Sequence, residues 1–392
     1  MQTITHNVSA KKLRFKRLRA ICTLAISAIA ISAIAISASA SAIESNLPKV
    51  SAIPATVMEG DKFSLLLTGT SPDGCGLARD SVKITGEEIT VVFIRAGGSL
   101  GICTQVLTPF SFPISVFDAG TAAKAGTYKV RIELAPIERN SQTVNKLLAF
   151  ALVPVTPFGK RPILPESGQW SYEEGGPHAT SGSGVGFNIE RQDQVLVNIS
   201  SLYGGDGSPE WYINSGTLVA NTLSSELFSV NGGQSLFGAY KPVKEVQYSG
   251  NVHLEFNSPV HGTAWFTQPI DEGLISGLKL MPISIARFSF GFGVGARALT
   301  TRWALVGEGA SAIQGSTLLL ADIANPGNTA WRYVSGDYQL NCELYAARPA
   351  LLPKSCSLTK SGVSVANFDQ IGYSRMRGSD AAGLSVSMFR LD

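Results

Sequence analysis

The chain contains few of the residues from which catalytic and metal sites are most often built. Four of its 392 residues are histidine, five are cysteine, and charged residues make up 16%, below the share of about 25% in a typical globular protein. His178, His253 and His261 show no metal-ligand spacing to one another or to a cysteine. The sequence therefore predicts neither a metal site nor a bound cofactor.

Long helical patterns are scarce as well. Few stretches keep a helical period beyond two turns, while short apolar or alternating runs recur between Gly, Asn, Asp and Pro. The 40 glycines suit a turn-dense β protein. This pattern argues against an α/β fold and predicts an all-β chain.

An export signal is expected at the start of the chain. Residues 1–19 carry six Lys or Arg and no acid, and residues 20–42 are almost wholly Ala, Ile and Ser, ending in Ala40-Ser41-Ala42. This order predicts a bacterial signal peptide over residues 1–42, cleaved after Ala42. An uncleaved anchor is the alternative, since the run is long enough to span a bilayer. Both place the rest outside the cytoplasm, whether secreted, periplasmic or on the cell surface.

Removal of this segment changes the sign of the net charge. The six cations leave without any acid, so 26 of the 32 Lys and Arg remain against 29 Asp and Glu. No basic patch remains to suggest a nucleic acid partner. A membrane is expected as a partner only through the signal segment, if that segment stays uncleaved.

Four cysteines remain in the mature chain, and their even number favours disulfides in an oxidising compartment. Three pairings are possible. We favour Cys75 with Cys103 and Cys342 with Cys356, because each pair lies inside one expected domain with turn-rich sequence between its members. Each bond would contribute on the order of 3 kcal/mol by the chain-entropy estimate.

The first expected domain spans residues 44–155. Its expected strands are 63–68, 82–85, 89–95, 128–134 and 147–153. Apolar and charged residues alternate strictly over 128–134, which predicts one buried and one solvated face. The preceding turn and Tyr128 resemble the start of a late strand in immunoglobulin-like sandwiches, although the tryptophan typical of antibody domains is absent.

Four prolines between residues 154 and 165 indicate a linker, and a second domain is expected over 168–295. Its first expected strands are 185–189, 195–203 and 210–213, with a hairpin turn over 204–209. Alternation over 252–256 predicts a further strand, with His253 and Glu255 as ordinary residues on a solvated face. An antiparallel meander or partly closed barrel is the expected architecture.

A third β unit is expected over residues 296–392, closed by Cys342 and Cys356, although it could instead complete the barrel of the second domain. Its expected strands are 303–306, 316–320, 331–334, 338–344 and 384–389. The opening at Trp303 and the turn before Trp331 echo the second domain.

The second domain also carries a motif. It reads Gly168-x-Trp170, then Tyr203-x-x-Asp206-Gly207-x-Pro209-x-Trp211-Tyr212, then Gly216-Thr217-Leu218 and Leu236-Phe237-Gly238. This pattern resembles a β-rich module found in many secreted bacterial proteins of unassigned function. The resemblance implies the module and no known activity.

Two patterns could suggest an enzyme. Gly97-Gly98-Ser99-Leu100-Gly101 matches the G-x-S-x-G nucleophile elbow, but Cys103, Pro109 and Pro113 leave no room for the helix that such an elbow needs, so a hairpin loop is expected. A glycosidase would need only two placed carboxylates. The candidates are Asp206, Glu210, Glu255, Asp271 and Glu272, which resemble ordinary turn and surface acids.

Aromatic residues are the remaining candidates for binding. Tyr203, Trp211 and Tyr212 flank the turn that contains Asp206, and Trp331 follows a similar turn. Such side chains could form a platform for sugar rings or for a protein. The competing interpretation is that alternate members are core residues, with Trp211 packed inward.

We therefore expect a non-catalytic secreted or cell-surface protein that binds a glycan or a protein partner. A secreted hydrolase with unrecognised carboxylates and a lipocalin-like carrier of a small ligand are the alternatives.

Overall fold

Strands dominate the computed structural model of the chain, as the sequence predicts. The structure describes residues 47–71, 73–96, 104–117, 121–136, 144–159, 161–173, 185–270, 277–292, 295–308, 311, 313, 315–324, 330–345 and 352–391. Helix within these ranges is limited to two short 3-10 turns, η1 (Phe290–Phe292) and η2 (Gly295–Leu299). No helix in the described ranges has the length and hydropathy to cross a membrane. The expected signal segment lies outside the described residues.

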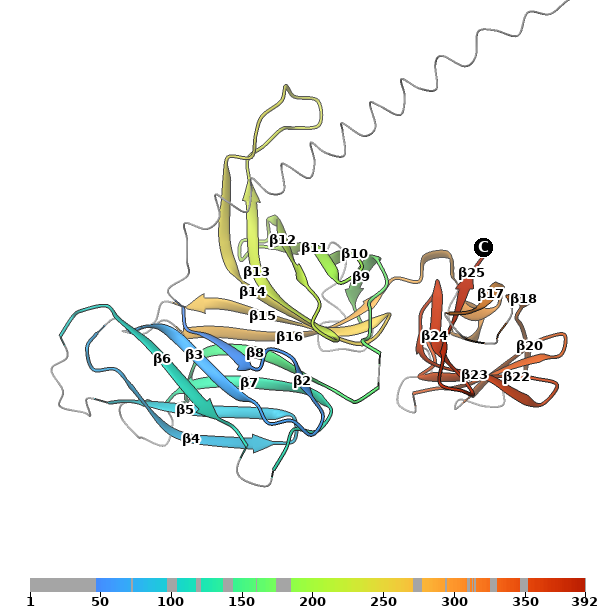
Figure 1. The fold of residues 1–392 in the computed structure, drawn as a ribbon. Helices are drawn as coiled ribbons and strands as arrows, with labels where there is room; N and C mark the ends of the chain where they lie inside the picture. Colours follow the sequence, from blue (N-terminus) through green and yellow to red (C-terminus); the bar gives the residue numbers. More distant parts are fainter. Residues whose placement is uncertain are drawn as a thin grey trace, which may run out of the picture. The chain divides into compact units, whose positions relative to one another are not determined.

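The N-terminal strands form a β-sandwich of two sheets, with strand orders β1-β3-β6 and β2-β8-β7-β5-β4 (Figure 1). The strands are β1 (Lys49–Ile53), β2 (Val57–Met58), β3 (Ser64–Ser71), β4 (Leu77–Thr85), β5 (Glu88–Arg95), β6 (Thr108–Ser115), β7 (Gly126–Leu134) and β8 (Lys146–Thr156). Alternate apolar residues of both sheets meet in one core, which is the arrangement expected of aligned sheets.

The sandwich contains a tyrosine corner, a feature typical of immunoglobulin-like sandwiches, although β5 and β7 pair in parallel. The backbone N–H of Lys124 donates to the Tyr128 hydroxyl at 3.0 Å, and the Tyr128 ring packs edge-on against Phe63 and Phe117. Strand β6 was missed by sequence reasoning because it contains two prolines. It lies at the edge of its sheet, where a proline nitrogen has no ladder hydrogen bond to lose.

Strands β9–β16 close into an antiparallel barrel in which the first strand, β9, pairs with the last, β16. The strands are β9 (Gly168–Tyr172), β10 (Gly186–Gln192), β11 (Val195–Tyr203), β12 (Pro209–Thr217), β13 (Thr222–Asn231), β14 (Glu245–Ser258), β15 (His261–Ile270) and β16 (Gly277–Arg287). The predicted hairpin between β11 and β12 is present, with Tyr203 opposite Pro209. Large side chains fill the barrel, among them Trp170, Phe187 and Phe256, each fully buried.

The C-terminal strands form a separate nine-stranded sheet of order β18-β17-β25-β24-β23-β22-β21-β20-β19 rather than completing the barrel. The strands are β17 (Arg302–Gly307), β18 (Ser316–Leu319), β19 (Ala321–Ala324), β20 (Ala330–Ser335), β21 (Tyr338–Glu343), β22 (Ser355–Lys360), β23 (Val363–Ile371), β24 (Arg375–Asp380) and β25 (Ser385–Arg390).

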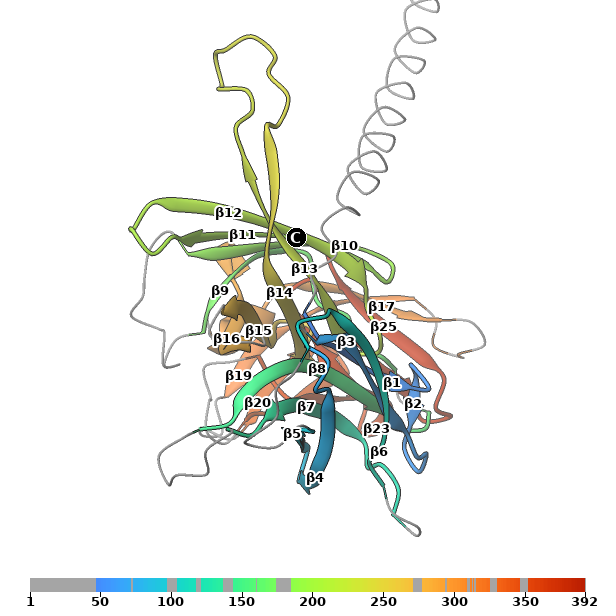
Figure 2. The same cartoon turned by 90° about the vertical axis from the view of Figure 1, so that its left-hand side faces the viewer.

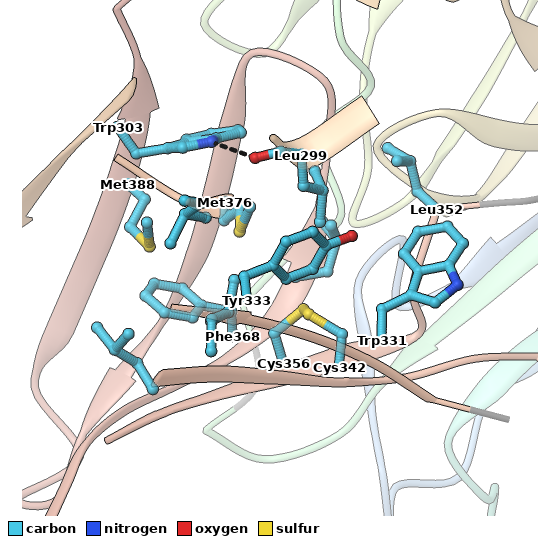
Figure 3. Packing of buried hydrophobic residues seen from close by; sticks show 14 of the residues in the cluster. Leu299, Trp303, Trp331, Tyr333, Cys342, Leu352, Cys356, Phe368, Met376 and Met388 are labelled. Atoms are coloured by element: carbon cyan, nitrogen blue, oxygen red, sulfur yellow. Dashed lines mark hydrogen bonds between the residues drawn. A yellow bond between two sulfur atoms is a disulfide. The ribbon is translucent and has the colours of Figure 1, made fainter. Parts of the chain in front are cut away.

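The predicted disulfide between Cys342 and Cys356 joins β21 to β22 at directly opposed positions (Figure 3). Cys75 is also disulfide-bonded. Its predicted partner, Cys103, lies outside the described residues, so that pairing stays a prediction.

The barrel and the C-terminal sheet begin in the same way. Trp170 on β9 donates its indole N–H to the carbonyl of Glu166 at 3.1 Å, and Trp303 on β17 donates to the carbonyl of Leu299 at 3.1 Å (Figure 3). Both rings are fully buried, and both strands pair with the last strand of their own sheet. The echo in the sequence therefore corresponds to a shared opening of two meanders.

Strand β8 is buried along both of its faces. One face enters the sandwich core, while the ring of Phe150 on the other lies 5.4 Å from Trp265 and 5.2 Å from His253 of the barrel. The expectation that His253 and Glu255 lie on a solvated face is therefore wrong. The outer face of β14 is covered by the sandwich, so both side chains are buried.

The charged face of β7 is likewise not open to solvent. Lys129 places its ammonium 3.2 Å from carboxylate oxygens of both Glu87 and Glu255, and its side chain is only 18% exposed. The alternation of apolar and charged residues over 128–134 predicts β7 and its buried face correctly. Sequence reasoning could not reveal that a second domain covers the charged face.

The two-sided burial of β8 makes Phe150 a test of the contact between sandwich and barrel. Phe150→Ala is expected to lower the free energy of unfolding by about 3–5 kcal/mol, because the side chain is 6% exposed and leaves a cavity. Urea denaturation measures this. Phe158→Ala, at a ring that is 90% exposed, should stay within about 0.5 kcal/mol of wild type. Equal stability of the two variants would contradict the contact.

Burial of His253 predicts a loss of stability in mild acid. Burial lowers the pKa of His253 to about 4, whereas the unfolded chain protonates it near 6.5. Above 6.5 the imidazole is neutral in both states; below it, the unfolded chain binds a proton that the folded chain does not. Stability is therefore expected to fall by up to roughly 3 kcal/mol between pH 6.5 and pH 4. Urea titrations across this range should show a shallower loss for His253→Gln, and identical slopes would contradict a buried neutral imidazole.

Candidate functional site

A cleft of about 440 Å³ opens at the end of the barrel where β11 turns into β12, a volume typical of small-ligand sites. Four neighbouring strands contribute to it. Its walls are Pro209–Tyr212 of β12, Ser229–Asn231 of β13, Gln247–Ser249 of β14 and Gln268–Pro269 of β15. Two of the predicted binding residues, Trp211 and Tyr212, therefore line one cleft.

Trp211 lies on the outer wall of this cleft and is 61% exposed. The expectation that Trp211 packs inward is wrong, because the alternation of β12 turns Tyr212 and Asn214 toward the barrel interior and leaves Trp211 outside. Tyr203 lies on the same outer face, since it pairs with Pro209 two positions from Trp211. Tyr203 and Trp211 form an exposed aromatic strip beside the cleft.

Tyr212 and Glu210 form the inner wall. The Tyr212 hydroxyl donates a hydrogen bond to the Glu210 carboxylate, and both side chains are half-buried. Burial raises the pKa of Tyr212 to about 12, assisted by this hydrogen bond and by the charge of Glu210. The phenol therefore remains a neutral donor bound to Glu210, which holds the carboxylate at a fixed position in the cleft.

The turn at Gly204 brings a second carboxylate close to Glu210. A Cβ at residue 204 would lie 2.6 Å from a Glu210 oxygen and 3.1 Å from an Asp206 oxygen, so both carboxylates lie close to Gly204. Asp206 accepts hydrogen bonds from the Ser208 hydroxyl at 2.6 Å and from the Ser208 backbone N–H at 2.9 Å. The side-chain bond and the backbone bond from Ser208 lower the pKa of Asp206. Asp206 thus stabilises the turn as an anion.

A buried polar network supports the cleft from inside the barrel. The Asn198 amide donates to Ser200 at 2.9 Å and to Asn214 at 2.8 Å, and Asn214 donates to Ser225 at 2.9 Å. These bonds connect β11, β12 and β13 directly beneath the aromatic residues. Sequence reasoning missed the network, although polar residues at the inward positions of β11 and β12 were its signal.

The cleft also holds amides that sequence reasoning did not find. Asn231, Gln247 and Gln268 line it and can both donate and accept hydrogen bonds. They come from β13, β14 and β15, far along the chain from Trp211. Only the closure of the barrel brings them together, so no local motif could indicate them.

Trp331 does not belong to this site. It is 4% exposed and packs in the core of the C-terminal sheet near Leu352 (Figure 3). Its prediction as a surface binding residue is therefore wrong, because the alternation of β20 turns Trp331 and Tyr333 inward.

The other candidates do not gather into a catalytic or metal site. Glu255 is buried against Lys129 on the sandwich-facing side of the barrel. Among the residues that the structure describes, no three His, Cys, Asp or Glu side chains are placed to hold a metal ion. The candidates His178, Asp271, Glu272 and the Gly97–Gly101 motif lie outside the described ranges.

Strands β13 and β14 continue past the cleft as a hairpin that projects from the barrel (Figures 1 and 2). Beyond the last ladder pair, Asn231 with Glu245, the turn exposes three apolar side chains. Leu236, Phe237 and Tyr240 are each at least 84% exposed. Exposed apolar groups at the end of a hairpin are typical of contact with another molecule.

Comparison with protein families matches residues 65–145 to the ORF11 beta-sandwich domain. The matched segment begins in β3 and ends directly before β8, so it supports the sandwich and does not include the cleft. No curated protein and no solved structure matches the chain. The resemblance of the barrel to a module of secreted bacterial proteins stays a prediction.

The exposure of Trp211 can be measured directly. Iodide is expected to quench a distinct fraction of the tryptophan fluorescence, and Trp211→Phe should remove that fraction, because Trp170, Trp303 and Trp331 are buried. Trp265→Phe, at a half-buried position, is the matched control and should keep it. Unchanged quenching in Trp211→Phe would contradict the outward position of Trp211.

Proposed function

We propose that the protein is a non-catalytic glycan-binding protein that acts outside the cytoplasm and binds a saccharide in the cleft beside Trp211. The observation that carries this proposal is an exposed tryptophan ring at the edge of a cleft lined by amides and one carboxylate. The disulfide between Cys342 and Cys356 supports an oxidising location.

A saccharide combines an apolar ring face with hydroxyl groups along its edge. The Trp211 ring offers a flat apolar surface for the first, at a small entropic cost because the side chain has only two rotatable bonds. Gln247, Gln268 and Glu210 offer donors and acceptors for the hydroxyl groups. A cleft of about 440 Å³ accommodates one or two sugar rings and their water.

A hydrolytic function is less well supported. A glycosidase needs two carboxyl groups that face its substrate. Glu210 is the one acid among the described residues that line the cleft, whereas Asp206 does not line it and binds Ser208 within the turn. A carrier function is not proposed either, because side chains fill the barrel.

The binding hypothesis predicts the effect of removing the aromatic ring. The whole chain is expected to bind a subset of the saccharides on a glycan array. Trp211→Ala should weaken binding of these saccharides by about tenfold or more. Gln268→Ala should weaken it less, through loss of one hydrogen-bonding group. Calorimetry with the retained saccharides measures both.

Phe158→Ala is the matched control, since this exposed ring lies outside the cleft. The proposal fails if no saccharide is retained, or if Trp211→Ala binds as tightly as wild type.

A protein partner is the second candidate, and the outer face of β11 and β12 favours it. Val195, Val197 and Ile213 are exposed on the same face as Tyr203 and Trp211, so the aromatic strip continues as an apolar strip. This candidate is favoured over the first if the chain binds no saccharide on the array and captures a protein whose binding depends on Ile213.

A further inference from the structure

A second cavity, of about 270 Å³, lies on another part of the chain. It is formed by the segment Leu164–Ser167, the end of β10, and strands β23 and β24. Three arginines line it: Arg191 on β10, and Arg375 and Arg377 on β24. None of these residues belongs to the cleft beside Trp211.

Two of the arginines are held in place, and the third is not. Arg191 donates to the carbonyl of Pro165 at 2.9 Å, and Arg375 donates to Glu308 at 2.7 Å. Arg377 points to the same side of β24 as Arg375, because the two are separated by one residue of the strand. Across the ranges that the structure describes, the side chain of Arg377 makes no hydrogen bond or ion pair.

The cations around Arg377 repel one another. Burial lowers the pKa of Arg377, and the charges of Arg375, Arg191 and Arg161 lower it further, against an opposing effect of Glu308. Guanidinium groups without matching carboxylates form the usual protein site for an oxyanion, since their planar N–H groups match its oxygen atoms.

The two nearest carboxylates offset only part of this charge, since Glu166 and Glu308 stand against three arginines. Glu166 accepts N–H bonds from Ser374 at 2.8 Å and from Arg375 at 3.1 Å. Glu308 accepts from Ser385 at 2.7 Å and Ser387 at 2.5 Å, and the Ser387 bond is the largest of the effects that lower its pKa to about 2.

One buried acceptor in the same cavity also lacks a partner. Gln370 lies directly opposite Arg377 in the β23–β24 ladder and is 4% exposed. Its amide N–H groups donate to the carbonyls of Pro162 at 3.1 Å and Arg161 at 3.4 Å, which fixes the orientation of the amide. The amide oxygen is buried and has no hydrogen-bond partner among the described residues.

We propose that this arginine cavity binds inorganic phosphate as hydrogen phosphate, with the guanidinium groups on its charged oxygens and its hydroxyl group donating to the Gln370 oxygen. The donors and the orphan acceptor require an anion that still carries a proton. Hydrogen phosphate meets both requirements at neutral and mildly alkaline pH. Sulfate, of the same shape and charge, has no proton to donate.

A phosphate monoester differs in the same way, because it has lost its second proton at pH 8 and then only accepts hydrogen bonds. The preference for free phosphate over sulfate and over a monoester is therefore the signature of this site. It is independent of the proposed saccharide binding, since the residues concerned are different.

Titration calorimetry of the whole chain at pH 8 in a chloride buffer tests the proposal with sodium phosphate, sodium sulfate and methyl phosphate. Phosphate is expected to bind at least about fivefold more tightly than the other two, because each of them leaves the buried Gln370 oxygen unpaired. Arg377→Gln is expected to weaken phosphate binding by about tenfold or more, since a charge-assisted hydrogen bond is lost.

Arg332→Gln, at an exposed arginine on β20, is the matched control and should bind phosphate as wild type does. Thermal melting of each variant confirms folding, and the comparison of anions on the wild-type chain needs no variant. Equal affinity for phosphate and sulfate, unchanged affinity in Arg377→Gln, or no heat with phosphate would each overturn the proposal.

Discussion

The structure depends on one strand that serves two cores. Strand β8 lies between β2 and β7 in the five-stranded sheet of the sandwich. One of its faces packs in the sandwich core, and the other covers the outer wall of the barrel through the ring of Phe150. Its eleven residues are consequently almost all apolar, as expected of a strand without a solvated face. The neutral His253 and the ion pair of Lys129 with Glu255 follow from this arrangement, because both lie on the faces that β8 and β7 bring together.

The barrel and the C-terminal sheet join their first strand to their last strand in the same way. Each must hold its first strand against its last, and each fixes a tryptophan at that closure by a hydrogen bond to the carbonyl four residues earlier. Closure leaves the barrel without free edges. It also brings Trp211 and the amides of three other strands to the lining of one cleft.

Local patterns in the sequence predict many of the strands. Alternation and turn residues predict β7 and the β11–β12 hairpin, and the even number and the placement of the cysteines predict the disulfide between Cys342 and Cys356. They fail where the outcome depends on a distant segment. The position of Trp211 depends on the register of β12 against the barrel core, and the burial of His253 and Glu255 depends on a separate domain.

The same limit applies to the binding sites. Gln268 joins the cleft, and Gln370 lies opposite Arg377, only through pairing between strands. Their position around predicted turns drew attention to the aromatic residues. Local patterns gave no weight to single glutamines and arginines, whose roles depend entirely on their neighbours in space.

The two faces of β8 also impose an order on folding during synthesis. As the chain elongates from its N-terminus, the sandwich can form once β8 is made, yet Phe150 then lacks its cover until β14–β16 have followed. During that interval a nascent chain presents an apolar surface to its surroundings, and interruption after the proline-rich linker would yield a fragment prone to aggregate.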